Sequence, residues 1–118
     1  MKISVVVTNW NGLDLLKKNL EQVIKTSIEA EEIIVADDAS SDKSVDYIKE
    51  LQKKYSKLKL ISNKINIGFG KNSNNAIEKC KGELVVMLNS DIYPHKDYIK
   101  NSLKHFSDKD IFGVVFSE

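Results

Sequence analysis

The chain has 118 residues, with 18 Lys or Arg against 17 Asp or Glu, so its formal net charge is only +1. This balance excludes the basic footprint of a nucleic-acid-binding protein, and we expect no nucleic acid partner. A single cysteine excludes an intramolecular disulfide framework and fits a reducing cytoplasm. The length predicts one domain over residues 1–118.

The first half of the chain alternates short apolar runs with helical periodicity. Residues 3–7 are mostly β-branched, which predicts a strand buried on both faces. The run turns polar at Thr8, which is too short for a signal peptide or a transmembrane segment. Residues 13–24 place apolar side chains every three or four positions, the period of one helix face. A second strand is predicted at 33–36 and a second helix at 45–55.

The second half continues the alternation. It predicts strands at 58–61, 84–88 and 111–116, with helices at 76–80 and 99–106 between them. Strands that alternate with helices predict an α/β fold, a mainly parallel sheet with helices on both faces. In such sheets ligands bind beyond the carboxyl ends of the strands. Polar, acidic and aromatic residues follow four of the predicted strands, at 8–12, 37–42, 63–70 and 89–91.

Two adjacent carboxylates, Asp37 and Asp38, end the second predicted strand. Adjacent carboxylates repel, so they need solvent, a metal or hydrogen-bond donors nearby. An acceptor-only carboxylate at this place can take the imide N–H of uracil or thymine. Helix capping is the structural alternative, and it predicts Ser40, Ser41 or Asp42 as the N-cap of the helix that follows.

The segment 66–70, Asn-Ile-Gly-Phe-Gly, leads into a predicted helix. Gly68 and Gly70 allow close backbone approach, and free N–H groups at a helix start suit an anion. Lys71 could pair with a phosphate. The alternative is an ordinary turn with a helix cap and a solvent-facing lysine, because neither a dinucleotide fingerprint nor a Walker A motif is present.

The apolar run 84–88 stops at Asn89, Ser90 and Asp91. A carboxylate at a strand end can hold Mg²⁺ or Mn²⁺, which bridges phosphate oxygens. Asn89 could add a neutral carbonyl oxygen, and Pro94 prevents the strand from continuing.

Four other residues that often take part in binding or catalysis also have a purely structural interpretation. Trp10, the only tryptophan, is either a stacking surface for a base or a partly buried cover of the sheet edge. His95 and His105 lack metal-ligand spacing and are expected at the surface. Cys80 shares a helical face with Ala76 and is expected in the core.

Four segments together resemble the nucleotide-binding half of the family 2 glycosyltransferases, which have the GT-A fold. They are SVVVTNWN at 4–11, EIIVADDASSDKS at 32–44, NIGFGKNSNNAI at 66–77 and GELVVMLNSD at 82–91. The third segment is most similar to the rhamnosyltransferase-like branch of the family.

The resemblance implies roles for individual residues. Thr8 and Trp10 would flank the base, Asp38 would accept its imide proton, and Asp37 would support Asp38. Asp91 would bind Mn²⁺ or Mg²⁺ as the last member of a DXD-like motif, in which Asn89 replaces the first Asp. The remaining nucleotide-binding positions would be Gly68, Gly70, Lys71, Asn89 and Ser90.

The reaction implied is inverting transfer of a sugar from a UDP- or dTDP-sugar to an acceptor hydroxyl by direct displacement. Family members continue into an acceptor-binding half, so the general base is expected beyond Glu118. We therefore expect the chain to be the donor-binding part alone and to be cytoplasmic. A full-length protein is expected at the membrane periphery. Exposure of the apolar run 111–116 predicts self-association as a homodimer.

Two alternatives stay open at this point. One is a nucleotide-sugar-binding module without catalysis. The other is a phosphoacceptor receiver domain, which shares the length and the alternation but has its acidic pair after the first strand and a Lys after the fifth.

Overall fold

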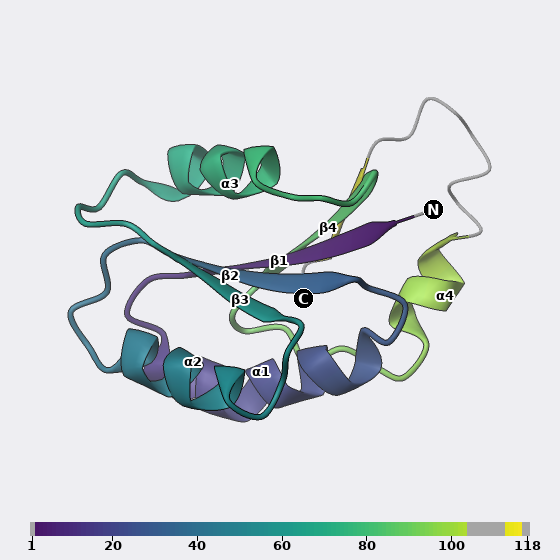
Figure 1. The fold of residues 1–118 in the computed structure, drawn as a ribbon, viewed down its shortest axis with the longest axis horizontal. Coiled ribbons are helices and arrows are strands. Elements are labelled where there is room, and N and C mark those ends of the chain that lie inside the picture. Colours follow the sequence, from purple (N-terminus) through teal and green to yellow (C-terminus); the bar gives the residue numbers. More distant parts are fainter. Residues whose placement is uncertain (1, 104–112, 117–118) are drawn as a thin grey trace.

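A computed structural model describes residues 2–103 and 113–116, with backbone only at 102–103 and 113–116. Strands and helices alternate along this part of the chain (Figure 1). The strands are β1 (Ile3–Asn9), β2 (Glu32–Asp37), β3 (Leu58–Ser62), β4 (Leu84–Asn89) and β5 (Gly113–Phe116). The helices are α1 (Leu13–Thr26), α2 (Ser44–Gln52), α3 (Phe69–Glu78) and α4 (Tyr98–Leu103).

All five described strands form one parallel sheet in the order β3-β2-β1-β4-β5. The predicted α/β class is therefore confirmed. Receiver domains use the order 2-1-3-4-5, with β1 between β2 and β3. Here β1 lies between β2 and β4, so the receiver alternative is wrong.

Helices cover both faces of the sheet, with α1 and α2 on one side and α3 on the other (Figure 1). Alternate residues of β1 belong to different apolar cores. Val5 and Val7 pack in the larger core with side chains from α1, α2 and α4, whereas Val6 packs in a smaller core with Ala76 of α3. The strand is apolar without interruption because both of its faces are buried.

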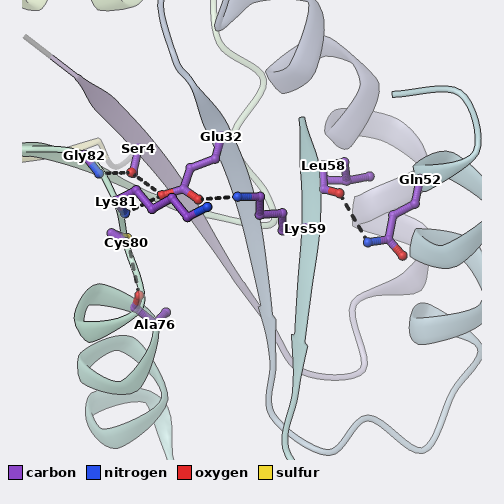
Figure 2. Close-up of polar contacts among 9 residues, drawn as sticks. All are labelled: Ser4, Glu32, Gln52, Leu58, Lys59, Ala76, Cys80, Lys81 and Gly82. Carbon is purple, nitrogen blue, oxygen red and sulfur yellow. Dashed lines mark hydrogen bonds and ion pairs between the residues drawn. The ribbon is translucent and has the colours of Figure 1, made fainter. Parts of the chain in front are cut away.

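The buried carboxylate of Glu32 links strands at the amino-terminal edge of the sheet (Figure 2). Glu32 Oε2 accepts hydrogen bonds from Ser4 Oγ and the Lys81 backbone N–H, both at 2.6 Å, and Oε1 pairs with Lys59 Nζ at 2.9 Å. Gly82 N donates to Ser4 Oγ, and a Cβ on Gly82 would lie 2.6 Å from the Ser4 backbone nitrogen. This cluster joins β1, β2, β3 and the segment just before β4, at the end of the sheet opposite to the predicted site.

Two helix boundaries differ from the prediction. Helix α3 begins at Phe69, within the segment 66–70 that was expected to lead into it, where the backbone turns at Gly68 with a φ of 89°, and it ends at Glu78, before Cys80. Cys80 therefore lies beyond the helix, half-buried at the edge of the smaller core. Helix α2 ends at Gln52, and turn hydrogen bonds carry the chain on to Tyr55.

The predictions near the carboxyl terminus are only partly covered. Strand β5 lies within the predicted run 111–116 and is an edge of the sheet as described. His105, Phe106, residues 111–112 and Glu118 lie outside the described residues. Self-association through this edge stays a prediction. Within the described ranges no helix is both long and apolar enough to cross a membrane.

Candidate functional site

The carboxyl ends of β1 and β4 lie side by side at the centre of the sheet. Thr8 is opposite Asn89 in the register, and Thr8 Oγ1 donates to Asn89 Oδ1 at 3.3 Å. Helix α1 follows β1 on one face, whereas α3 precedes β4 on the other face. This arrangement makes the gap between β1 and β4 the topological switch point, where open α/β sheets bind ligands.

A cleft of about 350 Å³ opens at this edge. Its size is within the range of small-molecule sites. Two aromatic side chains border it, and both are largely exposed, Trp10 at 60% and Phe69 at 65%. Their ring faces are available for stacking on a planar ligand. The lining residues are Thr8, Asn9, Trp10, Asp38, Asn66, Gly68, Phe69 and Asn72.

Asp38 is the charged residue of the cleft, and it is only 3% exposed. Its Oδ1 accepts from the Ile67 backbone N–H at 2.9 Å and from Asn63 Nδ2 at 3.0 Å, and its Oδ2 accepts from Gly68 N at 2.9 Å. Burial by itself raises the pKa of Asp38, but the donors of Ile67, Asn63 and Gly68 outweigh it and hold the pKa below its ordinary value. The carboxylate is therefore kept ionised as an acceptor.

Asp37 binds Asn9 and the loop at Ser40, and its side chain does not line the cleft. Its side chain is fully buried and accepts from Asn9 Nδ2 at 2.9 Å, Ser40 N at 3.0 Å and Ser40 Oγ at 2.7 Å. Successive residues of a strand point to opposite faces, so the two carboxylates are separated despite being neighbours. Asp37 is not among the residues that line the cleft.

The prediction that Ser40, Ser41 or Asp42 is the N-cap of the second helix was wrong. The N-cap of α2 is Lys43, and no side chain forms a cap hydrogen bond there. Asp42 instead accepts from Ser44 N at 2.9 Å and from Leu13 N at 3.1 Å, so one carboxylate serves the first turns of both α2 and α1. Burial raises the pKa of Asp42, but the bonds from Ser44 and Leu13 outweigh it and lower the pKa. Asn11 adds a second link, because its Oδ1 accepts from the backbone N–H of residue 41 at 2.7 Å.

The glycine segment contributes a turn. Gly68 has a positive φ, and no side-chain hydrogen bond caps α3 at this position. Gly68 N donates to Asp38, so this N–H is already used. Gly70 and Lys71 lie in the first turn of α3, are exposed, and do not line the cleft.

Asp91 lies apart from the cleft, in a hollow that also contains Leu15, Lys18, Asn19 and Tyr93. Its Oδ1 is buried and has no hydrogen-bond partner among the described residues. In residues 2–103 no group of three or more His, Cys, Asp or Glu side chains could hold a metal. A single carboxylate oxygen of this kind fits Mg²⁺ or Mn²⁺, which take few protein ligands when substrate phosphates and water supply the rest.

Besides Asn9 of β1, which lines the cleft, four contributors from one segment were not singled out from the sequence: Asn63, Asn66, Phe69 and Asn72. They lie in and just after the loop that follows β3, within a segment already noted for its glycines. The signal available was the run of amides and one aromatic residue in an otherwise polar loop. An amide is recognisable as functional only when its partners are known.

The family model described as glycosyl transferase family 2 matches residues 4–117. The chain belongs to this family. Among curated relatives, the poly(ribitol-phosphate) beta-glucosyltransferase of Bacillus spizizenii is 36% identical over 96 residues, which is 79% of this chain and 15% of the relative. A GalNAc(5)-diNAcBac-PP-undecaprenol beta-1,3-glucosyltransferase of Campylobacter jejuni is 34% identical over 76% of this chain and 29% of its own length. The chain thus spans less than a third of these two relatives.

Solved structures of glycosyltransferases share the fold. S. aureus TarS 1–349 in complex with UDP-GlcNAc has a TM-score of 0.78 and 28% identity, over 91% of this chain and 31% of the TarS 1–349 chain. The mannosyltransferase PcManGT of Pyrobaculum calidifontis, solved with GDP-Man and Mn²⁺, has a TM-score of 0.83 and 22% identity, over 93% and 33%. At that identity the second likeness concerns the fold alone. The rhamnosyltransferase-like branch stays a prediction.

Proposed function

We propose that this family 2 chain is the donor-binding part of a glycosyltransferase that takes a UDP- or dTDP-sugar and transfers the sugar, with inversion, to an acceptor hydroxyl. The observation that carries the proposal is the ionised Asp38 in a cleft that the exposed rings of Trp10 and Phe69 also line. A base that stacks on these rings can donate its imide N–H to Asp38. The relative solved with UDP-GlcNAc supports the nucleotide class.

Thr8, Asp37 and Gly68 hold this base site in shape. Thr8 links the ends of β1 and β4 through Asn89. Asp37 fixes the loop around Ser40, and Gly68 supplies one of the donors that keep Asp38 charged. In this proposal Asp37 acts through the backbone around the site and has no contact with the nucleotide.

The diphosphate would extend from the cleft along the switch point toward Asp91. Asp91 would hold Mn²⁺ or Mg²⁺ through its unpartnered Oδ1, and Asn89 and Ser90 would line the path. The ion, when bound, neutralises the charge that develops on the leaving nucleoside diphosphate. Lys71 and the backbone at Gly70, exposed in the first turn of α3, would add positive charge on the other side. The general base is assigned to no described residue and stays predicted beyond Glu118.

Calorimetric titration of UDP into the wild type and Asp91→Ala, each in Mn²⁺ and in EDTA, tests the metal role. We expect Asp91→Ala to lose at least about tenfold in UDP affinity in Mn²⁺, because a charged ligand to the metal is lost, and to match the wild type in EDTA. Asp46→Ala, an exposed aspartate in the first turn of α2, is the control. Equal losses with and without metal would contradict the assignment of Asp91.

A further inference from the structure

Asp91 is carried by a tight turn directly after β4. Ile92 N donates to the carbonyl oxygen of Asn89 at 3.1 Å, which closes a β-turn. Ser90 and Asp91 are its two central residues. Turn types I and II differ by a flip of the peptide between the central residues, and type II needs a positive φ at the second one. The direction of the Asp91 side chain therefore depends on how the Ser90–Asp91 peptide is oriented.

A side chain of α1 fixes that peptide. Asn19 Nδ2 donates to the carbonyl oxygen of Ser90 at 3.0 Å, and this oxygen belongs to the central peptide of the turn. Asn19 is only 7% exposed. Asp91 is not among the described residues with a positive φ, so the turn is not of type II. A flipped peptide would point the Ser90 oxygen away from α1, and the hydrogen bond from Asn19 therefore stabilises the observed form.

A second side chain of α1 holds the segment that follows the turn. Gln22 Nε2 donates to the carbonyl oxygen of Pro94 at 2.9 Å. Asn19 and Gln22 lie three positions apart and project from the same face of the helix. Ile92, which is 8% exposed, packs into the larger core between the two contacts. The loop is thereby held on both sides of Asp91.

The Asp91 carboxylate is not held by a partner of its own. Its Oδ1 is buried and accepts no hydrogen bond from any described residue. The ion pairs found among the described residues do not include it either. Asn19 lines the same hollow as Asp91. The placement of the carboxylate therefore depends on the backbone of the turn, and through it on α1.

We propose that Asn19 and Gln22 are positioning residues for the diphosphate end of the donor site, because they hold the turn in the form that presents Asp91 to a divalent ion. The inference rests on the proposed function and adds the two side chains that tune its metal-assisted part. Neither side chain is assigned a contact with the nucleotide. A loosened turn populates the competent form less, which lowers the apparent affinity in proportion and leaves recognition of the base at Asp38 unchanged.

Calorimetric titration of UDP into the full chain, in Mn²⁺ and in EDTA, compares the wild type with Asn19→Ala. The measured quantity is the ratio of the UDP dissociation constant in EDTA to that in Mn²⁺. Loss of one neutral hydrogen bond should lower this ratio by roughly two- to tenfold. Alanine is a better helix former than asparagine, so the variant does not weaken α1 itself. Asn101→Ala, at an exposed asparagine on α4, is the matched control and should leave the ratio unchanged.

Gln22→Ala is the second variant, and it alone decides if Asn19→Ala does not fold. It should lower the ratio by a smaller factor, because Pro94 lies three positions beyond Asp91. Damage to the fold in general would weaken UDP equally in both buffers and leave the ratio constant, and that result in both variants overturns the proposal. Asn19→Ala added to Asp91→Ala should change the ratio no further, since no carboxylate is left to position. A further fall in that double variant also overturns the proposal.

The same titrations separate this inference from the proposed function. If Mn²⁺ tightens UDP binding to the wild type and Asp91→Ala abolishes that gain, while Asn19→Ala and Gln22→Ala retain it in full, only the positioning role is refuted. If the wild type binds UDP equally in Mn²⁺ and in EDTA, the metal role of Asp91 in the proposed function fails and the inference fails with it.

Discussion

Replacement of Glu32 by Gln tests whether the amino-terminal edge stabilises the fold independently of the site. Glu32 is 2% exposed and accepts from Ser4, Lys81 and Lys59. The Gln amide can be oriented so that its oxygen replaces Glu32 Oε2 and still accepts from Ser4 and Lys81. Its NH₂ group then faces Lys59. The Lys59 side chain is 43% exposed, so its ammonium group can return to water and the loss of that pair costs little.

The larger loss comes from charge assistance. Hydrogen bonds to charged groups contribute about 1.5–3 kcal/mol and neutral ones about 0.5–1.5 kcal/mol, so two weakened bonds cost about 2 kcal/mol together. The pKa of Glu32 also indicates that the charge stabilises the fold. Burial raises this pKa, but the hydrogen bonds from Ser4, Lys81 and Lys59 outweigh burial, so that the pKa lies below its ordinary value. The charged form therefore stabilises the folded state on balance.

Urea unfolding at pH 7 measures the change, with the exposed neighbour Glu31→Gln as the control. A loss of about 2 kcal/mol corresponds to a midpoint shift of roughly 1–2 M urea. A folded-state pKa below the ordinary value of about 4.3 makes this contribution complete above that pH and absent once the pH falls below the folded pKa. The difference between wild type and Glu32→Gln should therefore shrink on acidification below about pH 4.

Two results would refute this reasoning. One is a loss at pH 7 no larger than that of Glu31→Gln. The other is a difference that grows as the pH falls. Because Glu32 lies at the amino-terminal edge of the sheet, the preference for UDP over CDP should be the same in the variant and the wild type.

Two further predictions concern the cleft. Asp38→Asn has one acceptor oxygen for three donors, so we expect the preference for UDP over CDP to fall and the stability of the fold to drop by about 1–3 kcal/mol, because one buried donor is left unpaired. Titration of both nucleotides measures the first effect and urea unfolding measures the second. Equal binding of UDP and CDP by the wild type would contradict the role of Asp38. Trp10→Ala should weaken UDP by roughly 5- to 150-fold through lost stacking and leave the urea midpoint nearly unchanged, because the ring is largely exposed; unaltered UDP affinity would show that the ring is not a base platform.

Much of the fold was accessible from local patterns. Uninterrupted β-branched runs such as residues 3–7 identify strands covered on both faces, and the structure buries every residue of β1. The three- and four-residue spacing identified α1 to within two residues at its end. Placement of Thr8, Asp38 and Asn89 at one edge followed from parallel strands, because their carboxyl ends coincide.

The site could be anticipated only in part, because a residue type shows what a side chain is able to do and not which partner it meets. Asp37 and Asp38 are identical in type and adjacent, yet one is bound by Ser40 and the other faces the cleft. Asp91 was expected to bind a metal at the same edge of the sheet, and the structure places it in a hollow separate from the cleft of Asp38.

The sequence by itself determined the α/β class, the strands and the edge that carries the polar residues, because these depend on periodicity and on chain direction. Only the tertiary structure decided the strand order, the ion pair of Glu32 with Lys59, and the amide hydrogen bonds of Asn63 and Asn72. These contacts join residues that are separated along the chain, by 9 positions for Asn63 and Asn72, 27 for the ion pair, and 36 for Asn72 and Ala36. The direction of a hydrogen bond depends on what each partner already binds, and local sequence patterns carry no record of that.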